Sequence, residues 1–195
     1  MFRFFRISGA LVALLLPLVL VACANKTVPL AYTPVGPAAH PAPGATMVTL
    51  VALQDQRPDV TKIGTRRDGT PFTPAGSVTD WVSRALADEL TRQGLLVSYT
   101  DTPIVTTDGA TGMNLVSGTI DDLSLTEDNF LNYAVKIAIT LRITDKNGKP
   151  LSTESFRITQ TATSMPTEDN IRDLLTDSLR DVVAPAALKV RQTLK

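Results

Sequence analysis

The sequence predicts an α+β fold, a two-layer sandwich with a mostly antiparallel sheet and two helices on one of its faces. Two observations predict the helices and one predicts the sheet. Residues 77–93 and the segment after Thr167 repeat apolar residues at helical spacing, whereas residues 135–144 alternate apolar and polar ones. The expected order from residue 47 is β-α-β-β-β-β-α, which packs most simply with both helices on the same side of the sheet.

The first strand and the first helix are each marked by the pattern of their apolar residues. Residues 47–53 are apolar on both faces, which is typical of a central strand covered by helices. Ser77, with Asp80 three places later, is expected to cap the helix, and Gly94 is expected to end it. Trp81 borders the apolar stripe and is interpreted as a packing residue. The stripe consists of Val78, Val82, Ala85, Leu86 and Leu90.

The middle of the chain is expected to hold a strand at 95–99, a loop at 100–112 and a strand at 113–125. The inward positions of the third strand change phase near Asp121 and Asp122. A change of phase within a strand predicts a β-bulge.

The clearest pattern is the alternation over residues 135–144, which is typical of a strand with one solvated face. Asn147-Gly148 predicts a hairpin turn, and residues 151–164 are expected to return antiparallel beside the first arm. Thr167 is expected to cap the last helix. Pro185 falls inside that helix and is expected to kink or split it, because proline removes a backbone hydrogen bond.

Residues 1–22 are interpreted as a lipoprotein signal peptide. Arg3 and Arg6 precede an uncharged apolar run of about 16 residues, shorter than the ~20 that a membrane-spanning helix needs. The run ends in Leu20-Val21-Ala22-Cys23, which resembles the bacterial lipobox, so Cys23 is the expected site of lipidation. The alternative is an ordinary signal peptide or an anchor helix with an incidental cysteine. Ala24 follows in place of Asp, and by resemblance to the Gram-negative sorting rule this favours the periplasmic face of the outer membrane.

Residues 23–46 are interpreted as a lipid-anchored, proline-rich tether and residues 47–195 as one periplasmic domain. The tether carries five prolines and shows neither helical nor strand periodicity. Such a chain reaches on the order of 70 Å when it is fully extended. The single histidine, His40, lies in the tether, where a flexible chain cannot hold an imidazole in a catalytic geometry.

Composition excludes several classes of function. The 19 Lys and Arg residues balance the 19 Asp and Glu residues, which argues against a strongly basic nucleic-acid binder. One cysteine and one histidine leave little material for a zinc site, a disulfide or a catalytic pair. The sequence contains no glycine-rich phosphate-binding motif. We therefore expect no cofactor, no metal site, no nucleic-acid partner and no enzymatic activity.

Residues 54–76 form a long connection, and connections of this length are often functional. Its guanidinium and ammonium groups could pair with carboxylates or phosphates. The candidate partner-binding residues are Asp55, Arg57, Lys62, Arg66 and Arg67. The competing interpretation is a solvated loop with a small Asp68-Gly69 hairpin, in which Asp55 and Arg57 stabilise the turn after the first strand.

The densest acidic cluster consists of Asp121, Asp122, Glu127 and Asp128. Paired carboxylates can hydrolyse glycosides or bind a hard cation. Their spacing supports neither role, and the EF-hand pattern is absent. The cluster is interpreted as the polar end of a strand with its bulge and turn.

Several segments together resemble the YajG-type bacterial lipoproteins. They are the lipobox, the strand leading into Asp55-Gln56-Arg57, the Ile63-Gly64 segment, the helix ending in Arg92-Gln93-Gly94, the long hairpin and the C-terminal helix. The resemblance covers roughly residues 47–194 and implies an envelope lipoprotein without an established activity, so no catalytic residue carries over. More distantly, the layout is similar to auxiliary lipoproteins of ABC-type envelope transporters and to the N-terminal domain of the Tol-system propeller protein. A likeness of this kind cannot assign a partner.

We expect a non-enzymatic, lipid-anchored envelope lipoprotein whose periplasmic domain binds or helps assemble another envelope component, through residues 54–76 and an exposed sheet edge. The alternative is an auxiliary lipoprotein of a lipid or ABC-type transport system, with a ligand in an apolar groove between the helices and the sheet. A third hypothesis is an enzyme that acts on cell-wall glycan through the acidic cluster. The expected partners are the membrane, through the lipid, and an envelope protein. The oligomeric state stays open.

Overall fold

The computed structural model describes residues 26–36, 41, 43–104 and 112–195. The expected signal peptide, the lipidation site Cys23 and the tether residue His40 lie outside the described residues. Within the described part of the chain, no helix has both the length and the apolar character needed to span a membrane.

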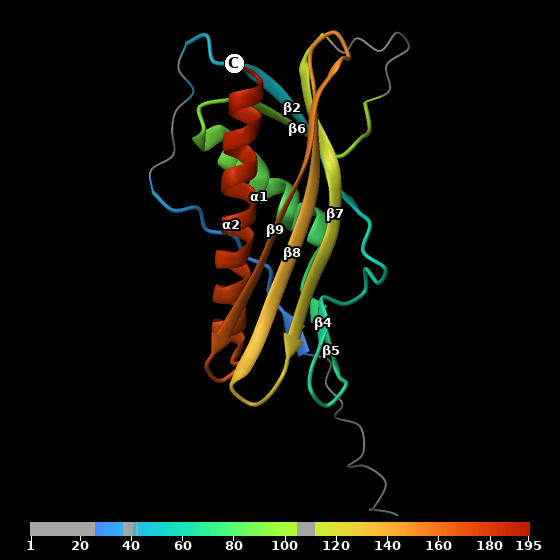
Figure 1. Cartoon of the computed structure of the whole chain (residues 1–195), viewed down its shortest axis with the longest axis vertical. Helices are drawn as coiled ribbons and strands as arrows, with labels where there is room; N and C mark the ends of the chain where they lie inside the picture. Colours follow the sequence, from blue (N-terminus) through green and yellow to red (C-terminus); the bar gives the residue numbers. More distant parts are fainter. Residues whose placement is uncertain (1–25, 37–40, 42, 105–111) are drawn as a thin grey trace, which may run out of the picture.

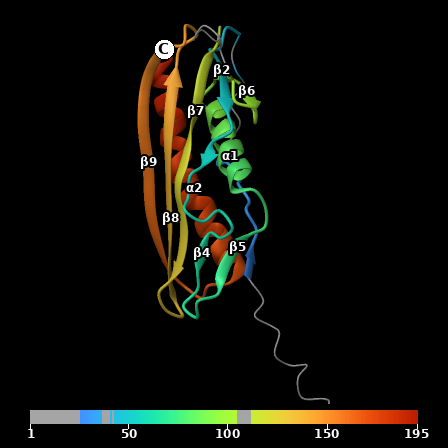
Figure 2. The same ribbon diagram turned by 90° about the vertical axis from the view of Figure 1, so that its right-hand side faces the viewer.

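The molecule is a two-layer α+β sandwich, as expected, with one mixed sheet and two helices on one of its faces (Figure 1, Figure 2). The strands, in chain order among the described residues, are β1 Lys26–Val28, β2 Met47–Val51, β3 Gln54–Asp55, β4 Gly64–Thr65, β5 Pro71–Pro74, β6 Leu96–Thr100, β7 Asn114–Glu127, β8 Asn132–Thr144 and β9 Pro150–Thr163. The helices are α1 Val78–Arg92 and α2 Glu168–Thr193.

Three long strands, β7, β8 and β9, form an antiparallel meander that makes up one side of the sheet. The predicted alternation is present in β8, where every second residue from Tyr133 to Ile143 is buried. The predicted bulge is present in β7, where the register shifts between Ile120 and Asp122. These elements confirm the strands predicted from residue 113 onward.

The other side of the sheet is built from short strands that pair with β7 in succession. β2, β3 and β4 each run parallel to β7 and meet it at residues 114–116, 119–120 and 125–126. β2 also pairs in parallel with β6, because α1 carries the chain back before the next strand begins, and a crossover of this kind produces parallel strands. The expected central strand is therefore central, with parallel neighbours on both sides.

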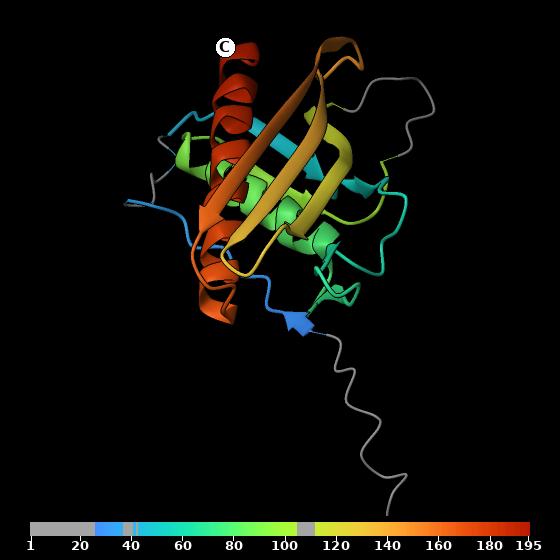
Figure 3. The ribbon, with the colours of Figure 1, turned by 60° about the horizontal axis from the view of Figure 1, so that its bottom comes forward.

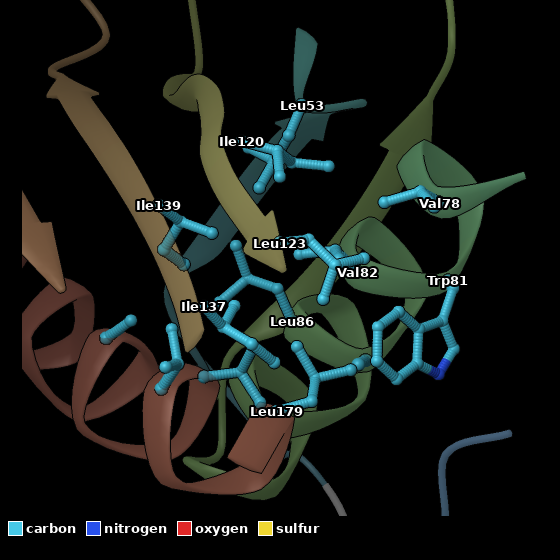
Figure 4. Close-up of a cluster of buried hydrophobic side chains, with 14 of the residues drawn as sticks. Leu53, Val78, Trp81, Val82, Leu86, Ile120, Leu123, Ile137, Ile139 and Leu179 are labelled. Atoms are coloured by element: carbon cyan, nitrogen blue, oxygen red, sulfur yellow. The ribbon is translucent and has the colours of Figure 1, made fainter. Parts of the chain in front are cut away.

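Both helices pack their apolar stripes on the same face of the sheet (Figure 2). Val82 and Leu86 of α1 meet Ile137 of β8 and Leu179 of α2 in a fully buried layer (Figure 4). One polar residue in this layer is Ser83, whose Oγ accepts a 2.9 Å hydrogen bond from the Leu53 amide. This bond joins α1 to the chain that leaves β2.

The C-terminal helix runs without a break through Pro185. We expected a kink or a split, and the expectation of a split was wrong. Proline removes the hydrogen bond to the carbonyl four residues earlier, which belongs to Asp181. Pro185 and Asp181 both lie on the exposed side of α2, where water can replace that bond.

Residues 26–36 pack on the domain, although they were assigned to the tether. β1 pairs in parallel with β5, and Val28 is 1% exposed. The Trp81 indole donates a 2.9 Å hydrogen bond to the carbonyl of Ala31, and Arg180 donates one of 3.0 Å to the carbonyl of Thr33. The folded body therefore includes residue 26 and does not begin at residue 47.

Candidate functional site

The five candidate partner-binding residues lie in a connection that is partly ordered into strands. β3, β4 and β5 all fall within residues 54–76 and attach the connection to β7 and β1. The pairing divides the candidates among three places: the interior of the loop, a cleft beside β7 and a groove at one end of the molecule.

Asp55 and Arg57 hold the loop from inside. The Arg57 guanidinium donates two hydrogen bonds to the Asp55 carboxylate, of 2.9 Å from Nε and 2.7 Å from Nη2. Its Nη1 donates a third, of 2.9 Å, to the carbonyl of Lys62. Arg57 is only 7% exposed, so its guanidinium serves mainly to stabilise the loop, and the residue also forms part of the wall of the cleft that holds Lys62.

Lys62 lies on a cleft between residues 58–65 and β7, which we call the lateral cleft. The cleft has a volume of about 450 Å³ and is also lined by Asp59, Asp121 and Asp122. The Lys62 ammonium lies 3.4 Å from the Asp59 carboxylate, and both side chains are 44% exposed. Hydrogen bonds from Thr61 hold the pKa of Asp59 below its usual value. The basic loop and the acidic bulge of β7, distant in sequence, therefore share one surface.

The four residues of the predicted acidic cluster do not act as one group. Asp121 accepts hydrogen bonds of 2.5 Å from Thr119 and 2.6 Å from Thr140. Asp122 pairs with Lys136 at 2.6 Å, and Glu127 pairs with Arg66 across the sheet. In the described ranges, no group of histidine, cysteine and acidic side chains has the arrangement of a metal site.

Arg66 and Arg67 lie on a second depression, which we call the end groove. It has a volume of about 500 Å³. Its lining residues are Arg66, Arg67, Asp68, Glu127, Phe130, Met165, Pro166 and Thr167. They come from three turns far apart in sequence, between β4 and β5, between β7 and β8, and between β9 and α2, which meet at the lower end in Figure 1.

Three contacts bring these turns together. The Arg66 Nε lies 3.2 Å from the Glu127 carboxylate, which is 7% exposed, and the Ser164 amide donates a 2.7 Å hydrogen bond to the carbonyl of Leu131. Arg67 places its guanidinium carbon 4.9 Å from the centre of the Phe130 ring. A cation over an aromatic face is attracted by the ring.

The end groove, lined by Phe130 and Met165, and the adjacent position Leu131 carry large apolar side chains that sequence reasoning missed. Phe130 is 74% exposed, Met165 66% and Leu131 50%. Phe130 and Met165 each follow a polar residue, Leu131 follows Phe130, and none of the three belongs to an apolar stripe, so periodicity could not find them. The available signal was their chemistry, because large apolar residues are unusual in hairpin turns, where Gly, Pro, Asn, Asp and Ser dominate.

No family model matches the chain, and no curated protein matches its sequence. Solved structures do match. A DUF330-family protein from Xanthomonas campestris is 12% identical with a TM-score of 0.62, over 86% of this chain and 95% of that chain. An uncharacterised protein is 13% identical with a TM-score of 0.52, over 75% of this chain and 99% of that chain. The fold is shared with these two proteins.

A minor lipoprotein from Acinetobacter baumannii is also among the structural matches. It is 14% identical over 77% of this chain and 93% of that chain, with a TM-score of 0.40. The structural neighbours of the chain thus include a DUF330 protein, an uncharacterised protein and a bacterial lipoprotein. At 12 and 13% identity, the two neighbours with the higher TM-scores establish a common fold and no common activity.

Proposed function

We propose that the protein is a non-enzymatic, lipid-anchored lipoprotein of the bacterial envelope, and that its domain binds or helps assemble another envelope component. The observation that carries the proposal is the position of the lipobox. Cys23 stands three residues before a strand of the folded domain, since β1 begins at Lys26. A lipid on Cys23 would therefore fix the whole domain at a membrane surface, where its partners are other envelope components.

The chemistry of the described residues supports a binding role over a catalytic one. Glycoside hydrolysis needs two carboxyl groups set against one bond, one as acid and one as base or nucleophile. Asp122 and Glu127 are instead neutralised by Lys136 and Arg66, and Asp121 accepts two hydroxyl hydrogen bonds. These contacts occupy three of the four carboxylates on which the third hypothesis, an enzyme acting on cell-wall glycan, depends.

The lateral cleft is the proposed partner-binding surface. It presents an ammonium and carboxylates side by side, which suits a partner that also carries both signs of charge. Lys62 and Asp59 are both exposed there, whereas the Asp55–Arg57 pair behind them fixes the shape of the loop. The candidates therefore have different roles. Lys62 contacts the partner, and the Asp55–Arg57 pair holds the loop that carries Lys62 in position.

Lipidation is tested by the intact mass of the protein purified from membranes. We expect the wild-type chain to begin at Cys23 with acyl chains attached. The Cys23→Ala variant should keep its signal segment or appear without lipid. A wild-type mass that corresponds to an unmodified cysteine would contradict the anchor.

The membrane is tested separately. Ala24 is the residue that favours the outer membrane by the sorting rule, so the Ala24→Asp variant should move from the outer to the inner membrane fraction. If the wild type and the Ala24→Asp variant are found in the same membrane fraction, the outer-membrane assignment is contradicted, and the lipid anchor is not affected.

The partner surface is tested with a photo-crosslinking residue at position 62. We expect a discrete crosslinked species that disappears when Asp59 is changed to Lys. A probe at Lys149, an exposed residue of the hairpin between β8 and β9, is the matched control and should give no such species. The same products at both positions, or none at position 62, would contradict the lateral cleft as the binding surface.

The alternative, an auxiliary lipoprotein of a lipid or ABC-type transport system, was expected to hold its ligand between the helices and the sheet. Among the described residues, that layer is packed with buried side chains such as Leu86, Ile137 and Leu179 (Figure 4). The remaining support for the alternative is the apolar lining of the end groove. Native mass spectrometry of the detergent-solubilised protein would favour it if one lipid molecule stays bound beyond the covalent acyl chains.

A further inference from the structure

We propose that the end groove and the turns around it are the membrane-contacting face of the domain, and that Phe130, Leu131 and Met165 insert into the headgroup region of the leaflet that carries the lipid. The inference rests on the proposed function, because it takes Cys23 as the lipid-bearing residue. It adds an orientation of the domain and a second, non-covalent contact with the same membrane.

The chain between the lipid and the domain is short. Lys26 lies opposite Phe72 in the parallel pairing of β1 with β5. Cys23 is three residues earlier, and three residues of extended chain span at most about 11 Å. The start of β1 must therefore stay within that distance of the acylated residue.

β1 starts close to the end groove. Its partner Phe72 lies beneath the end groove, since the Arg66 guanidinium carbon is 6.0 Å from the Phe72 ring centre. Figure 3 brings this end forward and shows β1 beside the turn between β4 and β5. The anchor would thus emerge at the same end of the long axis as the groove.

Large apolar side chains are exposed at that end. Phe130, Leu131 and Met165 are 74%, 50% and 66% exposed, and they stand in turns that protrude beyond the ends of the strands (Figure 1). Bulky apolar side chains on protruding turns are costly to expose to water and gain free energy when they enter a membrane interface. Arg67 lies against Phe130 and can keep its charged group at headgroup level while the ring goes deeper.

The sign of the charge at the groove end decides how the contact with the membrane would form. Five acidic residues at this end outnumber three basic residues. The acidic residues are Asp68, Glu127, Asp128, Glu168 and Asp169, and the basic residues are Lys26, Arg66 and Arg67. Attraction to anionic lipids is therefore not the driving force. The contact is apolar, and it should form on a zwitterionic bilayer.

The experiment measures the depth of position 130 in the lipidated, full-length mature protein. Phe130→Trp is introduced, and the protein is reconstituted into nanodiscs of phosphatidylcholine brominated near the headgroup end of its acyl chains. Bromine quenches tryptophan only at close range. Because Phe130 is 74% exposed, its substitution should not disturb folding, and the native Trp81 is 7% exposed and supplies a constant background.

The matched control is Leu151→Trp. Leu151 is also an exposed apolar residue, at 41%, but it lies at the opposite end of the long axis, where β9 begins. We expect the added emission of the Phe130→Trp variant to fall about twofold and to shift to shorter wavelength, as for a side chain that lies about 5–10 Å deep in the interface. The added emission of the Leu151→Trp variant should not change.

Each other outcome overturns the inference in a recognisable way. If the protein carries its acyl chains and co-migrates with the nanodiscs, but the tryptophan introduced at position 130 is not quenched, the membrane-contacting face is wrong and the anchor stands. A shift to shorter wavelength without quenching would mean that a second copy of the chain covers the groove. If no acylated mass is found, the lipid anchor of the proposed function fails, and the inference fails with it because it takes Cys23 as the lipid-bearing residue.

Discussion

The Tyr32 hydroxyl donates a 2.6 Å hydrogen bond to a carboxylate oxygen of Glu89. Glu89 belongs to α1 and is 6% exposed, and Tyr32 belongs to the segment that follows β1. The bond therefore fastens the N-terminal segment to a buried charge on the first helix. The Arg92 Nε lies 3.5 Å from the same carboxylate oxygen.

Removing the hydroxyl should loosen this segment. Hydrogen bonds to charged groups contribute about 1.5–3 kcal/mol, so we expect Tyr32→Phe to lower the free energy of unfolding by about that amount at pH 7, as measured by urea denaturation. Tyr99→Phe is the matched control, because Tyr99 bonds to the exposed Asp80 at 3.3 Å. An equal loss in both variants would show that burial of the carboxylate is unimportant.

The Tyr32–Glu89 pair should also make the free energy of unfolding depend on pH in the alkaline range. Burial, and after it the hydrogen bond to Glu89, raise the pKa of Tyr32 above the ordinary 10.0, while Arg180 and Arg92 oppose the rise. The folded state thus holds the proton more tightly than the unfolded state. The stabilisation is complete below pH 10 and is lost as the pH rises above it. The advantage of the wild type over Tyr32→Phe should therefore shrink above pH 10 in the same denaturation assay.

A second prediction concerns the buried ion pair of the loop. Breaking a buried pair by removing one partner costs about 3–5 kcal/mol, so Arg57→Ala should strongly destabilise the protein and leave Asp55 uncompensated. Lys62→Ala removes an exposed charge from the same loop and should change the free energy of unfolding by less than about 0.5 kcal/mol. Thermal unfolding of the two variants separates a structural arginine from a surface lysine.

A third prediction compares two glycines, Gly64 and Gly76, of the connection formed by residues 54–76. A methyl group at Gly64 would collide with the backbone carbonyl of Leu125 in the neighbouring strand β7. A methyl group at Gly76 would meet nothing within 4 Å. Gly64→Ala should cost about 3 kcal/mol or more, since a backbone atom cannot move aside easily, whereas Gly76→Ala should be neutral or slightly stabilising. Urea denaturation measures both, and a tolerated Gly64→Ala would contradict the pairing of β4 with β7.

A fourth prediction concerns the hairpin between β8 and β9. The Asp145 carboxylate accepts hydrogen bonds from the amides of Lys149, at 2.9 Å, and Asn147, at 2.8 Å, and these bonds lower the pKa of Asp145. A lowered pKa means that the stabilisation is present above the unfolded value, near pH 4, and is lost as the pH falls below it. The difference in urea midpoint between the wild type and Asp145→Ala should therefore vanish toward pH 2. A difference that does not depend on pH would contradict the role of the carboxylate.

Much of the fold could be predicted because its long elements repeat one simple pattern. The alternation of β8 and the caps Ser77 and Thr167 are local features, and the structure confirms them. The bulge at Asp121 was also visible as a change of phase in one strand. Local patterns of this kind are set by residues that are neighbours in the chain, so a single sequence is enough to see them.

The rest depends on contacts between segments that are distant in sequence. β3 and β4 have two residues each and exist because β7 offers them hydrogen bonds. The segment 26–36 was assigned to the tether because of its prolines, yet Val28, Leu30 and Tyr32 alternate toward the core. That three-residue alternation was the only local sign. The end groove left no sign in periodicity, because three separate turns build it.

The short pairing of β1 has a mechanical consequence. A force applied between a lipid on Cys23 and a partner on the domain would load β1 first, and β1 shares only three register positions with β5. β8 shares 12 register positions with β7, so these strands would stay paired after β1 has separated from β5. Freeing residues 26–46 would add on the order of 70 Å of extendable chain while the helices and the meander stay folded. The N-terminal segment would thus lengthen the link between the lipid and the domain only when the link is under tension.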